Sequence, residues 1–210
     1  MINFLNYKVI IFDLDDTIYD EHLYLEKAYN YIGECLCSSL TSCGITPHEI
    51  STFLLLEFEK EGREGLYEKL INKYDVVDFT LDNFLECMRT TPLKQGSIKI
   101  RPYMNHLINR MIKEKKMIFI LTNGNIKQQK NKINSLNIPH RNKIKVYYAS
   151  SKGLSFEKPN PYFLNLIKEV SSSHKSEIVF IGDSEIDKKT AFNSDIDFVN
   201  VQNLEPQSKY

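Results

Sequence analysis

The sequence predicts an α/β protein with a doubly wound parallel sheet and an inserted all-helical segment. Short apolar runs of strand length alternate with helical patterns, and several runs are continuously apolar, which is typical of strands buried on both faces of a parallel sheet. Residues 19–95 interrupt this alternation, because they show only helical periodicity. We therefore expect two structural units in the 210 residues.

The strands of the sheet are expected in five places. These are residues 8–12, 117–121, 143–148, 177–181 and 197–201. The helical stretches between the second and fifth strands have the length that a crossover between parallel strands requires. Pro102 lies where a proline opens the first turn of a helix, and Asn137 is expected to close the helix over 125–136 in a left-handed conformation. Together these segments predict a five-stranded, Rossmann-like core.

The inserted segment carries its own helix signals. Thr46 and Glu49 have the spacing of a capping box, and Pro47 lies at the first helical position between them. A further helix is expected from near Thr80 to Arg89. The predicted domain boundaries are therefore a core over 1–18 and 96–210, and a helical domain over 19–95.

Charge is unevenly distributed along a chain whose formal net charge is zero. Residues 18–95 carry 14 acidic and 7 basic side chains, whereas residues 96–152 carry 13 basic side chains and one acidic one. The basic segment could attract an anionic partner, or its lysines could be ordinary solvated surface residues. The lysines concerned are Lys113, Lys115, Lys116, Lys127, Lys130 and Lys132. No aromatic pattern typical of nucleic-acid binding is interleaved with them, so nucleic acid is not the expected partner.

Membrane and redox signals are weak. No apolar run approaches the roughly 18 residues that a membrane span needs. The N-terminal residues lack the pattern of a signal peptide, so we expect a cytoplasmic protein without a membrane partner. The four cysteines, Cys35, Cys37, Cys43 and Cys87, are expected to be free thiols, and their spacing does not favour a zinc site.

Carboxylates follow the first predicted strand directly. Asp13, Asp15 and Asp16 come at its carboxyl end, with no basic residue adjacent in sequence. Open α/β sheets bind ligands at this edge. A close pair of carboxylates there requires a divalent cation or a shared proton, although an Asp-rich turn or helix cap is the ordinary alternative.

Other strands end in complementary residues. Thr122 and Asn123 follow the second strand, Lys158 lies on a proline-stiffened loop after the third, and Asp183 and Asp187 follow the fourth. Each could be explained separately as a helix cap, a surface lysine or an acidic first turn. Because parallel strands end at one edge, we expect these acids, the hydroxyl and the lysine to converge there.

The order of these motifs resembles the haloacid dehalogenase-like (HAD) superfamily. The resemblance covers residues 8–201, and its motifs are Asp13-Leu-Asp15-Asp-Thr17, Thr122, Lys158-Pro-Asn-Pro161 and Gly182-Asp183-Ser-Glu-Ile-Asp187. It implies a Mg²⁺-dependent phosphatase that acts through an aspartyl-phosphate. The second carboxylate, Asp15, favours a phosphatase over a dehalogenase, because an alkoxide leaving group needs a general acid.

The resemblance also implies the role of each residue. Asp13 would attack phosphorus, and Asp15 would protonate the leaving oxygen and then activate water. Thr122, Asn123 and Lys158 would bind the phosphoryl oxygens. Mg²⁺ would bind the Asp13 carboxylate, the backbone carbonyl of Asp15 and Asp183, with Asp187 as a ligand or as support for one.

Residues 19–95 match the position of the family's helical cap. A cap favours a small phosphorylated metabolite, such as a nucleotide or a sugar phosphate. We expect the loop at Gly62–Gly65 to face the site, with an ordinary turn as the alternative, and Asn193 or Asp195 to take a left-handed turn before the last strand. A phosphomutase or other phosphotransferase would keep the same residues, and a phospho-accepting regulatory module is a further alternative. The oligomeric state stays open.

Overall fold

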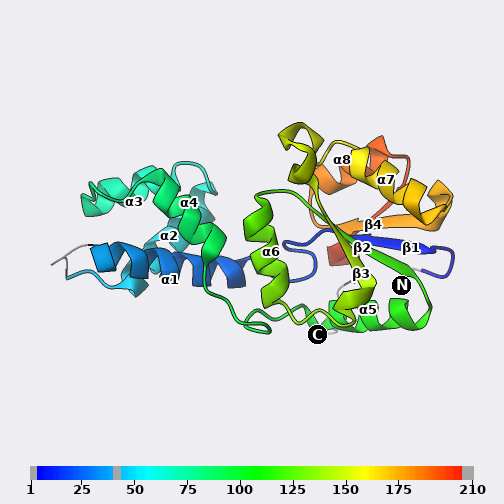
Figure 1. The fold of residues 1–210 in the computed structure, drawn as a ribbon, viewed down its shortest axis with the longest axis horizontal. Coiled ribbons are helices and arrows are strands. Elements are labelled where there is room, and N and C mark those ends of the chain that lie inside the picture. The colour runs from blue at the N-terminus through cyan, green and yellow to red at the C-terminus, as the bar shows by residue number, and fades with distance from the viewer. Residues whose placement is uncertain (1–3, 40–43, 205–210) are drawn as a thin grey trace.

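A computed structural model describes residues 4–39 and 44–204, and its centre is a five-stranded parallel sheet (Figure 1). The strand order is β3-β2-β1-β4-β5. The strands are β1 (Val9–Phe12), β2 (Met117–Thr122), β3 (Ile144–Tyr148), β4 (Ile178–Gly182) and β5 (Asp197–Asn200). The chain moves outward from β1 to β2 and β3, then crosses back to β4 and β5. The predicted α/β fold is confirmed, and the point where the strand order reverses lies between β1 and β4.

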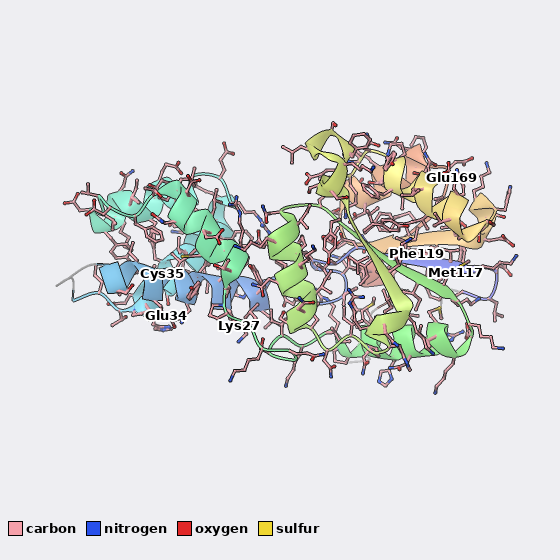
Figure 2. All side chains as sticks on the ribbon, in the orientation of Figure 1. Lys27, Glu34, Cys35, Met117, Phe119 and Glu169 are labelled. Atoms are coloured by element: carbon pink, nitrogen blue, oxygen red, sulfur yellow. The ribbon has the colours of Figure 1, made fainter. Side chains whose placement is uncertain are left out.

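Helices cover both faces of the sheet, which explains why its central strands are apolar throughout. They are α5 (Pro102–Lys113), α6 (Ile126–Ser135), α7 (Tyr162–Ser171) and α8 (Glu185–Asn193). Ile10 of β1 belongs to the same buried cluster as Met104 of α5, whereas the next residue, Ile11, belongs to the cluster of Leu164 on α7. Phe119 of β2 lies in the same buried cluster as Leu164 (Figure 2). Successive side chains on a strand point to opposite faces, so each strand contributes to both clusters.

Four helices form a second unit beside the sheet (Figure 1). They are α1 (His22–Ser39), α2 (Pro47–Glu61), α3 (Leu66–Tyr74) and α4 (Leu81–Thr90), and we call them the four-helix unit. Thr46 begins α2 with the predicted capping box, and Thr80 begins α4 with another. Gly33 lets α1 and α2 pack closely, because a Cβ on it would lie 2.6 Å from the carbonyl oxygen of Pro47.

Two chain segments connect the four-helix unit to the sheet, and they run side by side. Tyr19 forms an antiparallel bridge with Ile100, and the amide of Arg101 donates a hydrogen bond of 3.0 Å to the carbonyl of Ile18. The four-helix unit also contacts α6, where the side chain of Asn131 donates to the carbonyl of Thr91 at 2.8 Å. The unit is therefore joined to the core beside the carboxyl end of β1.

Two local predictions about helix ends had different outcomes. Asp195 has a φ of 56°, which confirms it as the left-handed residue before β5. The prediction that Asn137 closes the preceding helix was wrong. The helix α6 ends at Ser135, and Leu136 is extended, because it is buried in the core and pairs with Ile98.

The lysines of residues 96–152 do not form one exposed patch. Lys132 is buried, with 1% of its surface exposed, so the alternative of an ordinary solvated surface residue does not hold for it. Lys116 donates hydrogen bonds to the carbonyls of Phe4 and Tyr7. Some of the positive charges of residues 96–152 are therefore held by partners within the molecule.

The three cysteines among the described residues lie in the four-helix unit. Cys87 is buried on α4, and Cys35 and Cys37 are partly exposed on α1. Cys43 lies outside the described residues. None of the helices over 4–39 and 44–204 is long and apolar enough to cross a membrane.

Candidate active site

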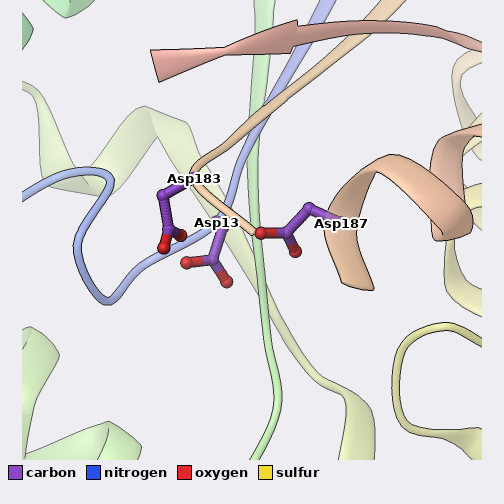
Figure 3. A group of neighbouring side chains, drawn as sticks. All are labelled: Asp13, Asp183 and Asp187. Carbon is purple, nitrogen blue, oxygen red and sulfur yellow. The ribbon is translucent and has the colours of Figure 1, made fainter. Parts of the chain in front are cut away.

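Three carboxylates meet at the carboxyl edge of the sheet (Figure 3). Asp13 directly follows β1, Asp183 directly follows β4, and Asp187 lies in the first turn of α8. One carboxylate oxygen from each lies within 4.8 Å of the others. We call these three side chains the acidic cluster.

A glycine makes this close approach possible. A Cβ on Gly182 would lie 2.6 Å from Oδ2 of Asp187, which is closer than real Cβ atoms come to other atoms. Ser184 caps α8, and its hydroxyl donates to the Asp187 carboxylate at 2.6 Å. The local sequence Gly182–Asp187 therefore sets the position of Asp187 by packing and by capping.

Lys158 is the cation of the acidic cluster. Its Nζ donates hydrogen bonds to Asp13 and, at 2.6 Å, to Asp187. Asn123 fixes the loop that carries Lys158. Its side chain accepts from the Lys158 amide at 2.9 Å and donates to the Lys158 carbonyl at 3.0 Å. Burial opposes the charge of Lys158, but attraction to the two carboxylates outweighs burial and raises the pKa of this lysine.

The acidic cluster holds more negative charge than Lys158 balances. Burial raises the pKa of Asp13, repulsion from Asp187 and Asp15 adds to the shift, and Lys158 opposes it. Burial and repulsion from Asp187 also raise the pKa of Asp183. A divalent cation would offset this repulsion, and carboxylate oxygens are the ligands that Mg²⁺ prefers. The acidic cluster therefore fits a metal site.

Thr122 ends β2 beside the acidic cluster. It is buried, and its hydroxyl accepts a hydrogen bond of 2.9 Å from Nε2 of Gln129 on α6. Thr122, Asn123 and Lys158 all line one cavity together with the acidic cluster. The structure thus brings the predicted hydroxyl, amide and lysine to the same edge as the predicted acids.

The Asp15 carboxylate has hydrogen-bond partners outside the acidic cluster. Its Oδ1 accepts hydrogen bonds from the Tyr19 hydroxyl at 2.5 Å and from Lys132 Nζ at 2.9 Å, and its Oδ2 accepts from Gln129 at 2.8 Å. Burial would raise the pKa of Asp15, but Lys132 and the hydrogen-bond donors lower it. The acidic cluster does not include this carboxylate.

The cavity has a volume of about 460 Å³ and lies between the sheet edge and the four-helix unit. Arg63, on the loop between α2 and α3, lines it from the four-helix side. The prediction that the loop at Gly62–Gly65 faces the site is confirmed for Arg63. Glu21, just before α1, pairs with both Arg63 and Lys132.

Sequence reasoning missed three of these residues. Glu21, Gln129 and Lys132 line the cavity but belong to none of the motifs identified in the sequence. Gln129 and Lys132 lie three positions apart on α6, and residues at that spacing share a helix face. The available signal was a polar face on the helix after Thr122. From the sequence, a buried polar face could not be distinguished from one exposed to solvent.

The comparisons with known proteins agree with this geometry. A model of the haloacid dehalogenase-like hydrolase family matches residues 10–201. Among curated proteins, none matches the chain.

Solved structures show the same fold. A Bacillus subtilis protein described as the HAD-hydrolase YfnB, bound to magnesium, is 16% identical, with a TM-score of 0.65 and coverage of 97% of this chain and 90% of that one. A Lactobacillus delbrueckii protein described as a phosphoglycolate phosphatase is 20% identical, with a TM-score of 0.57 and coverage of 92% and 85%. A HAD family enzyme from Bacteroides thetaiotaomicron, in complex with magnesium and inorganic phosphate, is 18% identical, with a TM-score of 0.54 and coverage of 96% and 98%.

Proposed function

Because the chain belongs to the haloacid dehalogenase-like hydrolases, we propose that it is a Mg²⁺-dependent phosphatase acting on a small phosphomonoester, such as a nucleotide or a sugar phosphate. The observation that carries the proposal is the acidic cluster with Lys158 at one side of the cavity and Asp15 at another. Phosphoryl transfer depends on this kind of positioning and charge stabilisation.

In the first half of the reaction, a carboxylate oxygen of Asp13 forms a bond to phosphorus as the bond to the leaving oxygen breaks. The negative charge of a bound substrate would raise the pKa of Asp15 above the lowered value it has here, so that Asp15 takes up a proton and gives it to the leaving oxygen. Lys158 and Thr122 would hold the phosphoryl oxygens during the transfer, which is supported by their position in the lining of the cavity. Mg²⁺ bound by the acidic cluster and the Asp15 carbonyl would supply positive charge against the substrate phosphate.

In the second half, a water molecule attacks the aspartyl-phosphate. Asp15, now ionised, accepts a proton from this water, and the bond between phosphorus and Asp13 breaks. Inorganic phosphate leaves, and both aspartates return to their starting states.

The four-helix unit would act as a cap over this site. Its support is the position of Arg63, which lines the cavity opposite the sheet edge. A site covered in this way excludes bulk water and favours small substrates over macromolecules. A soluble phosphorylated metabolite is also what a cytoplasmic enzyme would meet.

The test is a panel of phosphomonoesters assayed for phosphate release with Mg²⁺. We expect turnover by the wild type and by Asp82→Asn, an exposed position on α4, and loss of turnover in Asp13→Asn. Folded wild-type protein that releases no phosphate from any substrate would contradict the proposal. An isomerised sugar phosphate without free phosphate would identify a phosphomutase, and a stable phospho-protein without turnover would identify a regulatory module.

A further inference from the structure

Lys132 is a buried cation outside the motifs that define the proposed reaction. Its Nζ lies 2.9 Å from Oδ1 of Asp15 and 2.6 Å from Oε1 of Glu21, and 2% of its side chain is exposed. A buried lysine loses hydration, and an ion pair does not generally repay that loss in stability. The burial of Lys132 therefore calls for an explanation other than stability.

The contacts of Asp15 suggest that explanation. Tyr19 and Lys132 both donate to Oδ1, so this oxygen is held from two directions. Gln129 donates to Oδ2 at 2.8 Å, which fixes the rotation of the carboxylate plane. Tyr19 is a neighbour of Asp15 in the chain, whereas Lys132 comes from α6 and ties the carboxylate to a different element of the core.

Lys132 is itself held in place. Glu21 accepts from Lys132 through one oxygen and pairs with Arg63 through the other. The aliphatic part of Lys132 is enclosed, and its ammonium lies 4.8 Å from the centre of the Tyr24 ring. An ammonium with partners on several sides has one favourable position, and that position lies beside Asp15.

We infer that Lys132 is a positioning residue that holds the Asp15 carboxyl group in the orientation from which it protonates the leaving oxygen, and that Glu21 holds Lys132 for this purpose. The inference rests on the proposed phosphatase function. Lys132 acts through Asp15. General acid catalysis depends strongly on the direction of the donor, so a loosened Asp15 should transfer its proton poorly.

Two substrates that differ in the leaving group separate this role from a structural one. p-Nitrophenolate is a good leaving group that departs without a proton, whereas the alkoxide of an alkyl phosphate needs one. A lost positioning contact should therefore lower kcat/KM, which reports the steps through departure of the leaving group and not the later hydrolysis of the aspartyl-phosphate, much more for the alkyl phosphate than for p-nitrophenyl phosphate. General structural damage would lower both by the same factor.

The first variant is Lys132→Met, with Lys130→Met as its control, because Lys130 lies on the same helix and is exposed. General acid catalysis contributes about 10²- to 10⁴-fold, so we expect Lys132→Met to lose about 100-fold in kcat/KM on the alkyl phosphate. The loss on p-nitrophenyl phosphate should stay below about tenfold, and Lys130→Met should behave as the wild type. Equal losses on both substrates would overturn the inference.

Lys132→Met leaves the Asp15 carboxylate without its cation and removes one of the two cations paired with buried Glu21, so the variant can fail to fold. The double variant Lys132→Met with Glu21→Gln removes one charge of each sign and should show the same selective loss. Glu21→Gln alone keeps Lys132 and should show a smaller loss of the same kind. A wild-type ratio of the two kcat/KM values in whichever of these variants folds would overturn the inference. Failure of the proposed function itself would look different, since the wild type would hydrolyse neither substrate.

Discussion

Gly182→Ala is predicted to damage the metal site through a single steric contact. The added Cβ would lie 2.6 Å from Oδ2 of Asp187 and 2.7 Å from its Cβ and Cγ. Ordinary contact begins at 3.4 Å, so Asp187 would have to move by roughly 0.8 Å. The Cβ of Asp187 is attached directly to the backbone, so a change of rotamer at Asp187 cannot relieve its overlap with the added Cβ. The first turn of α8 must therefore shift.

The expected magnitudes follow from this displacement. Overpacking of this kind costs about 1–3 kcal/mol of folding stability. For a chain of this size each kcal/mol lowers the Tm by roughly 2–4 °C. The shift also lengthens the 2.6 Å contact between Asp187 and Lys158 toward the limit of hydrogen bonding and misplaces one oxygen of the acidic cluster. We expect the Mg²⁺ concentration for half-maximal activity to rise at least about tenfold, which corresponds to ~1.4 kcal/mol.

Gly33→Ala is the matched control, because its Cβ would lie 2.6 Å from the Pro47 carbonyl oxygen, in the four-helix unit. Both variants should lower the Tm of the metal-free protein in a thermal melt. Only Gly182→Ala should change the Mg²⁺ requirement when phosphate release is measured across a Mg²⁺ titration. The reasoning would be refuted if Gly182→Ala lost stability but kept the wild-type Mg²⁺ requirement.

Three further predictions concern other parts of the molecule. Mg²⁺ added to EDTA-treated protein should raise the Tm, because the cation offsets repulsion within the acidic cluster. At a concentration 100-fold above the Kd the stabilisation should be ~2.7 kcal/mol. A constant Tm would contradict the metal site. Burial raises the pKa of Cys87 to about 12, so its thiol stays protonated at mildly alkaline pH. Iodoacetamide should therefore modify Cys87 at least about tenfold more slowly in the folded than in the unfolded protein, with the rate rising as the pH approaches that value, as mass spectrometry can measure; equal rates would show that the thiol is accessible and ionised. Thr80→Ala removes the capping box of α4 and should cost about 0.5–2 kcal/mol in urea denaturation, whereas a change at the neighbouring exposed Asp82 to Asn should cost less.

The sheet and its functional edge could be predicted because their signals are local. Strands buried on both faces must be apolar at every position, so β1, β2 and β4 are visible as continuous runs. Residues that directly follow such strands are brought to one edge by the parallel topology alone. This is why Asp13, Thr122 and Asp183 could be expected together before their distances were known.

The residues around Asp15 could not be predicted in this way. Whether a helical lysine is buried depends on what packs against that face, and for Lys132 the partners are Glu21 and Asp15, more than 100 positions away. Arg63 poses the same problem, because its approach to Glu21 joins positions 42 apart in the chain and depends on how the helices of the four-helix unit pack. Asn137 failed for a related reason, since the burial of Leu136 and its pairing with Ile98 prevailed over a local preference.

The paired connection at Tyr19 and Ile100 bears on how such a protein can diversify. Because both crossings lie at one point, the four-helix unit amounts to a single long insertion between β1 and α5, and the register of every strand pair is independent of its sequence. In the proposed cap role, substitutions, insertions or wholesale exchange within residues 22–90 would alter which molecule reaches the cavity while the acidic cluster keeps its geometry. Substrate specificity and phosphoryl chemistry would then depend on different parts of the chain. Glu21, at the base of the insertion, lies at the junction of these two parts.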